Sequence, residues 1–179
     1  MAVPEVGFEL QFGTNFLGHV ALTQNGARVV SVSSSGHLSL VIFDDLNFNF
    51  VPCSPIGAYG RSKTADALLA IGITQHWADD GIRSNTPHPG AIATGLQEYT
   101  GRLKTPPNRR KTLEQGSSTS ALLAASPLLE GVSGLYFEDC NEALQVAKRR
   151  SDFTGGDARH AVDPDNAGRL WNLSMKLIL

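Results

Sequence analysis

The 179-residue sequence is short of cysteine, of long apolar runs and of excess charge, and each shortage excludes a class of protein. Its two cysteines, Cys53 and Cys140, form no CxxC pair and cannot build a disulfide framework, so we expect free thiols. No apolar run approaches the ~20 residues that a membrane-spanning helix needs. The net charge of -2 provides no basic surface for nucleic acid. One domain over residues 1–179 is therefore expected, with neither nucleic acid nor a membrane as its partner.

Three further absences limit the kinds of catalytic or ligand-binding site that the sequence can form. The sequence has no G-x-G-x-x-G, the glycine-rich turn at which dinucleotide-binding domains hold a pyrophosphate. It has no G-x-S-x-G turn of the kind that presents a hydrolase nucleophile. His19, His37 and His88 lack metal-ligand spacing, so we expect structural roles for them and no metal site. The first residues lack the basic and apolar stretches of a secretory signal, which favours a cytoplasmic protein.

Hydrophobic spacing predicts alternating helices and strands, which is the pattern of an α/β fold with a parallel sheet and flanking helices. The predicted strands cover residues 27–32, 82–86 and 134–137, the predicted helices cover 8–23, 58–77, 113–125 and 164–177, and residues 39–57 and 99–111 are expected to be loops. Thr112 with Gln115 forms a capping box before one of these helices, and Asp163 caps another. Pro87 is unexpected beside a strand, because proline removes a ladder hydrogen bond.

The strongest chemical feature is Tyr59-Gly-Arg-Ser-Lys63, near the start of the helix over 58–77. Residues four apart lie on one face of a helix, so the ammonium of Lys63 can approach the phenol of Tyr59. A positive charge beside a phenol lowers its pKa from an ordinary value of about 10. Such a phenol becomes a usable acid or base near neutral pH. A Tyr-x-x-x-Lys pair alone is weak evidence for a catalytic site. Whether the pair is catalytic depends on the segments that lie near it in the fold.

Two other segments are expected at the same edge of the sheet. Ser34 follows the strand over 27–32, and Pro89-Gly90-Ala91-Ile92-Ala93-Thr94 follows the strand over 82–86. Ligands of open α/β sheets bind beyond the carboxyl ends of the strands. A serine hydroxyl there could orient a substrate oxygen, and the backbone of residues 89–94 could wrap a flat ring. Loop capping is the open alternative for Ser34, which lies in a run of three serines.

Together these segments resemble the short-chain dehydrogenase/reductase family, and more narrowly its retinol-dehydrogenase-like or WW-domain-oxidoreductase-like branch. The similar segments are Asn15-Phe-Leu-Gly-His19, Arg28-Val-Val-Ser-Val-Ser-Ser34, Phe43-Asp-Asp-Leu-Asn-Phe48, Tyr59-Gly-Arg-Ser-Lys63, His88-Pro-Gly90 and Tyr136-Phe-Glu-Asp-Cys140. The likeness runs from about Gly7 to the end of the chain. It implies a partial Rossmann-like parallel sheet that keeps the last three strands, with the N-terminal dinucleotide-binding half missing.

The resemblance also implies a role for each site residue. Tyr59 would exchange a proton with the substrate oxygen, which Ser34 would orient by a hydrogen bond. Lys63 would lower the pKa of Tyr59 and bind the nicotinamide ribose. Asn15 would hold a water of the proton relay, although a surface amide is an equal alternative. The residues that would line the nicotinamide carboxamide are Pro89, Gly90, Ile92 and Thr94.

The implied activity is NAD(P)-dependent conversion between a small alcohol and an aldehyde or ketone, with NADP(H) preferred to NAD(H). Because the glycine-rich turn is absent, we expect weak dinucleotide binding and weak or no activity from the chain by itself. One alternative is a non-catalytic fragment that binds protein through the open edge of strand 27–32, or associates with itself through the helices carrying Asn15 and Tyr59. Another is an incomplete gene model of a full-length enzyme.

Overall fold

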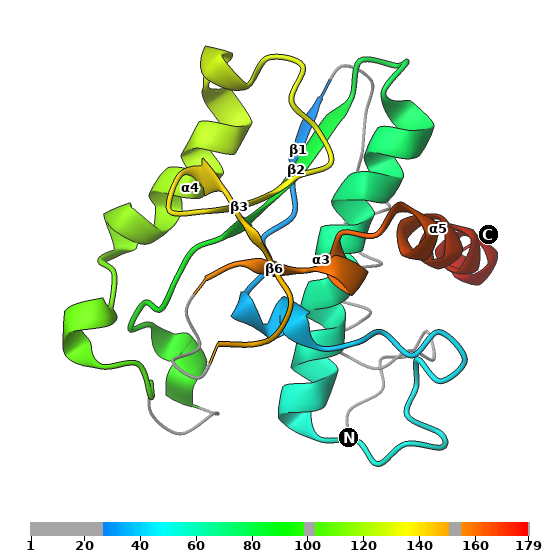
Figure 1. Ribbon diagram of the computed structural model, residues 1–179, viewed down its shortest axis with the longest axis horizontal. Coiled ribbons are helices and arrows are strands. Elements are labelled where there is room, and N and C mark those ends of the chain that lie inside the picture. The colour runs from blue at the N-terminus through cyan, green and yellow to red at the C-terminus, as the bar shows by residue number, and fades with distance from the viewer. Residues whose placement is uncertain (1–26, 99–102, 151–154, 179) are drawn as a thin grey trace.

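A computed structural model of the protein describes residues 27–98, 103–150 and 155–178, and its central feature is a sheet with helices on both faces (Figure 1). Strands β1 (Arg28–Val30), β2 (Arg83–His88) and β3 (Tyr136–Glu138) run parallel and are neighbours in that order. The short strand β4 (Asn141–Glu142) returns antiparallel to β3. Strands β5 (Gln145–Val146) and β6 (Asp157–Ala158) form a separate parallel pair. The predicted α/β class and the three predicted strands are confirmed.

The described residues include three α-helices. Helix α3 (Pro55–Trp77) contacts β2, and helix α4 (Leu113–Ala125) lies on the opposite face against β1 and β2 (Figure 1). Helix α5 (Pro164–Ile178) packs on the outer side of α3. Short 3-10 helices are η2 (Ser35–Leu38), η3 (Gly95–Glu98), η4 (Pro107–Arg109), η5 (Pro127–Leu129) and η6 (Arg159–Ala161). The predicted helix over 8–23, with Asn15, lies outside the described residues.

Helix α3 is the core element of the fold, and it begins three residues before the predicted start at residue 58. Ser54 caps it by accepting a hydrogen bond from the Gly57 N–H at 3.0 Å, and Pro55 occupies the first turn, where no N–H is needed. The prediction of a loop to residue 57 was therefore wrong, although serine followed by proline is itself a helix-start signal. Residues 64–73 are all buried. The main cluster comprises Val41, Ala65, Leu68, Leu69, Ile71, Ile73, Ile82, Ala167, Leu170 and Trp171.

Strand β2 continues through Pro87, two residues beyond its predicted end. The Pro87 carbonyl accepts a hydrogen bond from the Ser33 N–H at 2.9 Å, so β2 and the segment after β1 remain side by side. Proline has no N–H, so Pro87 cannot donate a hydrogen bond to that segment. Regular pairing of β1 therefore stops at Val30 rather than at residue 32, while its chain continues along β2 to Ser33. In the described part of the chain β1 pairs with β2 on one side only.

The other predicted helix starts are confirmed by their caps. The Thr112 hydroxyl accepts from the Gln115 N–H at 3.2 Å, and the Gln115 side chain accepts from the Thr112 N–H at 2.9 Å. The Asp163 carboxylate accepts from the Asn166 N–H at 2.9 Å before α5. Strands β4, β5 and β6 were not predicted, because two residues are too few to show a period. None of the helices that the structure describes combines the length and apolar content needed to span a bilayer.

Candidate active site

Tyr59 lies on the first turns of α3, against the 3-10 helix η2 that follows β1. A β-carbon placed on Gly36 would lie 3.2 Å from Cε1 of Tyr59, so the ring rests directly on this glycine. Gly60, the next residue of the helix, is equally close to η2, since a β-carbon there would lie 3.1 Å from the Gly36 carbonyl oxygen. Two glycines thus allow the helix and the turn to touch, and the phenol of Tyr59 is half-buried between them.

The ammonium of Lys63 is held by two hydrogen bonds near that ring. Its Nζ donates to the Val32 carbonyl at 2.8 Å and to Oδ2 of Asp66 at 2.9 Å. It lies 5.9 Å from the centre of the Tyr59 ring. The predicted pair is therefore together at the carboxyl end of β1, with the charge fixed by a strand carbonyl and a carboxylate rather than free in solvent.

Asp66 is a site residue that the sequence analysis missed. Its side chain is fully buried, and its Oδ1 has no partner among the described residues. Burial raises the pKa of Asp66 to about 7, although the charge of Lys63 and its hydrogen bond act in the opposite direction. The available signal was an acidic residue three positions after Lys63, on an otherwise apolar stretch of a predicted core helix.

Ser34 lies in the same corner as the cap of η2. Its hydroxyl oxygen accepts a hydrogen bond from the Gly36 N–H at 3.1 Å, which is the loop-capping role left open by the sequence. A serine hydroxyl that accepts one bond still has its own hydrogen to donate. Gly36, whose N–H the Ser34 hydroxyl accepts, is also the residue on which the phenol ring of Tyr59 rests. Capping therefore does not remove Ser34 from the site.

The segment from Pro89 to Thr94 follows β2 at the same edge of the sheet. Gly90 has a φ of +87°, a conformation that side-chain-bearing residues rarely adopt, and the Lys111 side chain crosses directly over it. Ile92 forms an isolated bridge with Lys111 and packs its side chain against Gly116 of α4. The loop predicted to wrap a flat ring is thus in contact with α4 and with Lys111, which precedes α4.

The buried His37 and the partly buried His88 lie beside these segments. His37 contacts the Ser34 carbonyl through Nδ1 at 2.7 Å, and its ring lies 4.2 Å from that of Tyr136. Burial lowers the pKa of His37 to about 4, and burial with the charge of Lys111 lowers that of His88 to about 4. Both are therefore neutral near pH 7. Cys53 and Cys140 are free thiols, as predicted. Among the residues that the structure describes, no three potential ligands gather into a metal site.

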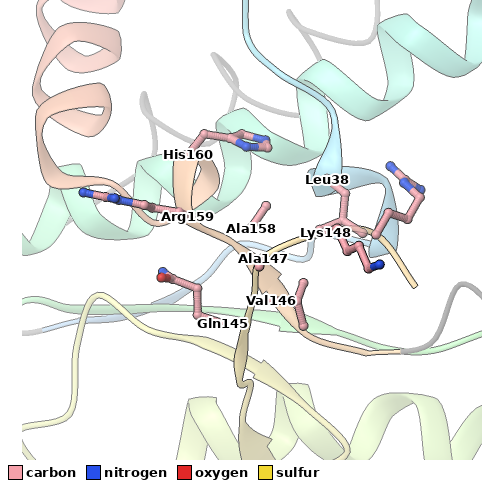
Figure 2. Close-up of a pocket in the computed structure, with 9 residues that line it drawn as sticks. Leu38, Gln145, Val146, Ala147, Lys148, Ala158, Arg159 and His160 are labelled. Carbon is pink, nitrogen blue, oxygen red and sulfur yellow. The ribbon is translucent and has the colours of Figure 1, made fainter. Parts of the chain in front are cut away.

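A cavity of about 520 Å³ lies beside Leu38 of η2 (Figure 2). It is lined by Leu38, Gln145, Val146, Ala147, Lys148, Arg149, Ala158, Arg159 and His160. Lys148 and Arg159 stand at opposite ends of its wall (Figure 2). The sequence analysis did not predict this cavity, because its walls come from β5, β6 and η2, which only tertiary structure brings together. Leu38 is two residues from Gly36, so the cavity adjoins the turn that supports Tyr59.

Known proteins resemble the chain over nearly its whole length, although no protein-family model matches it. A protein of Streptomyces antibioticus named "Probable oxidoreductase" is 44% identical and covers 92% of this chain and 62% of its own length. Short-chain dehydrogenase/reductase prx1 of Penicillium roqueforti is 33% identical over 99% of this chain and 59% of its own length. The chain belongs to the short-chain dehydrogenase/reductase family. It spans less than two thirds of the length of these curated family members.

The matched family members include a retinol dehydrogenase, in line with the expected retinol-dehydrogenase-like resemblance. Retinol dehydrogenase 14 of Homo sapiens is 33% identical over 97% of this chain and 53% of its own length. A solved structure of an uncharacterised protein from Mycobacterium paratuberculosis matches with a TM-score of 0.72 at 28% identity, over 98% of this chain and 61% of that one. BdcA in complex with NADPH, at 19% identity and a TM-score of 0.50, shares the fold alone.

Proposed function

We propose that this chain carries the catalytic and nicotinamide-side part of an NAD(P)-dependent oxidoreductase that interconverts a small alcohol and its aldehyde or ketone, with NADP(H) preferred to NAD(H). The observation that carries the proposal is the position of Lys63 Nζ, which two hydrogen bonds hold 5.9 Å from the centre of the Tyr59 ring. The pair lies at the carboxyl end of β1, where ligands of open α/β sheets bind. Membership of the family supports the same assignment.

In this proposal Tyr59 moves the proton. Its hydroxyl would donate a proton to a carbonyl oxygen during reduction, or accept one from an alcohol during oxidation. The ammonium of Lys63, held 5.9 Å from the centre of the ring, is the cation beside this phenol. Ser34 would use its free hydroxyl hydrogen to bond the same substrate oxygen and orient it. Asn15 would return protons through a bound water.

The nicotinamide would supply or accept the hydride when it is bound. The described residues fit that end of a dinucleotide. Lys63 could donate to a ribose hydroxyl, and the backbone of the loop from Pro89 and Gly90 to Ile92 and Thr94 offers both N–H and carbonyl groups. Gly90 adopts a positive φ, and the Lys111 side chain that crosses over it would have to move for a ring to contact this backbone.

The pyrophosphate end of a dinucleotide has no counterpart in the printed sequence, which contains no G-x-G-x-x-G. Charged hydrogen bonds contribute about 1.5–3 kcal/mol each, so the loss of several costs orders of magnitude in affinity. We therefore propose that the chain by itself binds NADPH weakly and turns over slowly.

A protein-binding module is the second candidate function. In the described residues β1 pairs only with β2, and an unpaired strand edge can accept a strand from another chain. Self-association through α3 has less support, because residues 64–73 of that helix are already buried by the chain itself. A light-scattering mass equal to the monomer, with no retained partner, would contradict both forms of association.

The cofactor assignment is tested by NADPH binding, followed through nicotinamide fluorescence. Lys63→Met in an Asp66→Asn background avoids leaving a buried carboxylate unpaired, and we expect it to weaken NADPH binding at least about tenfold relative to Asp66→Asn alone. Lys176→Met, on the exposed end of α5, is the matched control and should bind NADPH normally. Parallel titration with NADH tests the expected preference. Equal NADPH affinity with and without Lys63 would overturn the assignment.

A further inference from the structure

The side-chain amide of Gln97 is bonded to the loop that we propose holds the nicotinamide. Its Nε2 donates to the Ile92 carbonyl at 3.2 Å, and its Oε1 accepts from the Thr94 N–H at 2.7 Å. Both partners are backbone groups of the segment that follows β2. The amide therefore has its donor and its acceptor satisfied by two residues of one loop.

A glutamine side chain ends in a primary carboxamide, and so does nicotinamide. Each presents one oxygen that accepts and one NH2 group that donates, side by side in a plane. We infer that the side-chain amide of Gln97 competes with the nicotinamide carboxamide for the same backbone groups of the loop. Nicotinamide can bind these groups only when the Gln97 amide leaves them, so the free energy of that step limits the affinity of the site. This inference rests on the proposed function, because it takes the loop from Ile92 to Thr94 as the nicotinamide side.

Helix capping is the competing explanation for Gln97. Thr94 and Gln97 have the spacing of a capping box, and the Thr94 hydroxyl accepts from the Leu96 N–H at 3.3 Å at the start of η3. Capping accounts for the bond from the Thr94 N–H to Oε1. It does not require the second bond, in which Nε2 reaches back to the carbonyl of Ile92. The same motif occurs at Thr112 and Gln115, where it opens the regular helix α4 and provides a control within the chain.

Gln97 can leave the loop without unfolding it. The 3-10 helix η3 has four residues, and a β-carbon added to its Gly95 would meet nothing within 4 Å. The Leu96 side chain is 64% exposed. Little packing therefore holds the segment, and the main loss on departure is the pair of hydrogen bonds. Two such bonds in a half-exposed setting correspond to an affinity change of about 3- to 10-fold.

Binding of free nicotinamide and of NADPH, measured by NMR on the ¹⁵N-labelled chain, tests this competition. We expect Gln97→Ala to bind both ligands about 3- to 10-fold more tightly than the native chain. Gln115→Ala, which removes the matched capping glutamine, should leave both affinities unchanged. In the native chain each ligand should shift the Gln97 side-chain amide resonances and the Thr94 backbone amide together, a result that needs no substitution.

The outcomes separate the inference from the proposed function. Saturable binding of equal strength to the native chain and to Gln97→Ala would overturn the competition and leave the oxidoreductase assignment intact. A gain in affinity from Gln115→Ala as large as that from Gln97→Ala would show that Gln97 acts only as a helix cap. An absence of binding in every variant would overturn the proposed function, and the inference with it.

Discussion

At the scale of single residues, the unusual group of this site is the carboxylate of Asp66. A fully buried acid in the middle of a core helix is costly unless it is paired, and Lys63 is its partner at 2.9 Å. The pair fixes Nζ between Asp66 and the Val32 carbonyl. The ammonium of Lys63 is therefore held in one position relative to Tyr59. Burying the Asp66 carboxylate costs stability, and this cost depends on pH.

That cost predicts the effect of Asp66→Asn on unfolding. Burial raises the pKa of Asp66 to about 7 in the folded chain, above its ordinary value of 3.8. The folded state therefore holds the Asp66 proton more tightly. The contribution of Asp66 to stability is fully present below about pH 4 and is lost as the pH rises to about 7. Asn cannot titrate, so Asp66→Asn should gain stability relative to the native chain across this interval, by about 4 kcal/mol at most.

Urea unfolding of both chains at a series of pH values measures this difference. His37 and His88 titrate in the opposite sense, because burial lowers the pKa of each to about 4 and their contribution is lost as the pH falls from about 6.5. They are present in both chains, so they cancel in the difference. A free-energy difference between Asp66→Asn and the native chain that stays constant from acid to neutral pH would show that Asp66 is not the titrating group.

At the scale of elements, the site depends on how closely α3 approaches η2. A β-carbon on Gly60 would lie 2.8 Å from Cβ of Ser39 and 3.1 Å from the Gly36 carbonyl oxygen. Thr64, one turn further along the helix, donates to the His37 carbonyl at 2.8 Å. The glycine inside Tyr59-Gly-Arg-Ser-Lys63 is thus the residue that lets the helix carry Tyr59 up to the turn.

Gly60→Ala should therefore destabilise the protein, although alanine is the better helix former. Overpacking a close contact costs about 1–3 kcal/mol, which exceeds the gain of about 1 kcal/mol in helix propensity. Gly168→Ala in α5 is the matched control, since its nearest neighbour would be at 4.0 Å, and it should stabilise by about 0.5–1 kcal/mol. Thermal unfolding of the two variants distinguishes them. A stabilising Gly60→Ala would show that α3 and η2 are not in tight contact.

The sequence predicts the elements better than it predicts the details of the site. Periodic apolar residues and caps at Thr112 and Asp163 identified α4 and α5, because those signals are local. The predicted ends of β1 and β2 were wrong, because the true ends depend on which backbone groups Pro87 leaves unpaired across the sheet. Asp66 and Gln97 were missed for a related reason. Their partners, Lys63 in a buried setting and the Ile92 carbonyl, become visible only when the chain is folded.

At the scale of the whole molecule, the three parallel strands bring distant segments to one edge. The turn after β1 provides Ser34, the loop after β2 provides the residues from Pro89 to Thr94, and α3 provides Tyr59 and Lys63. This arrangement needs β1, α3, β2 and the loop after β2, which are contiguous in the chain from residue 28 to residue 94. A protein that spans less than two thirds of its curated relatives can therefore still assemble the proposed catalytic corner.

The central claim is that Tyr59 is the proton-transferring group of a nicotinamide-dependent alcohol or carbonyl oxidoreductase. The most direct test is turnover of an aliphatic aldehyde by the native chain and by Tyr59→Phe, with NADPH in large excess to offset weak binding. The account predicts slow reduction by the native chain and a rate lower by about 10²-fold or more in Tyr59→Phe, the size of effect expected for a lost general acid. Equal rates for the two chains would contradict it.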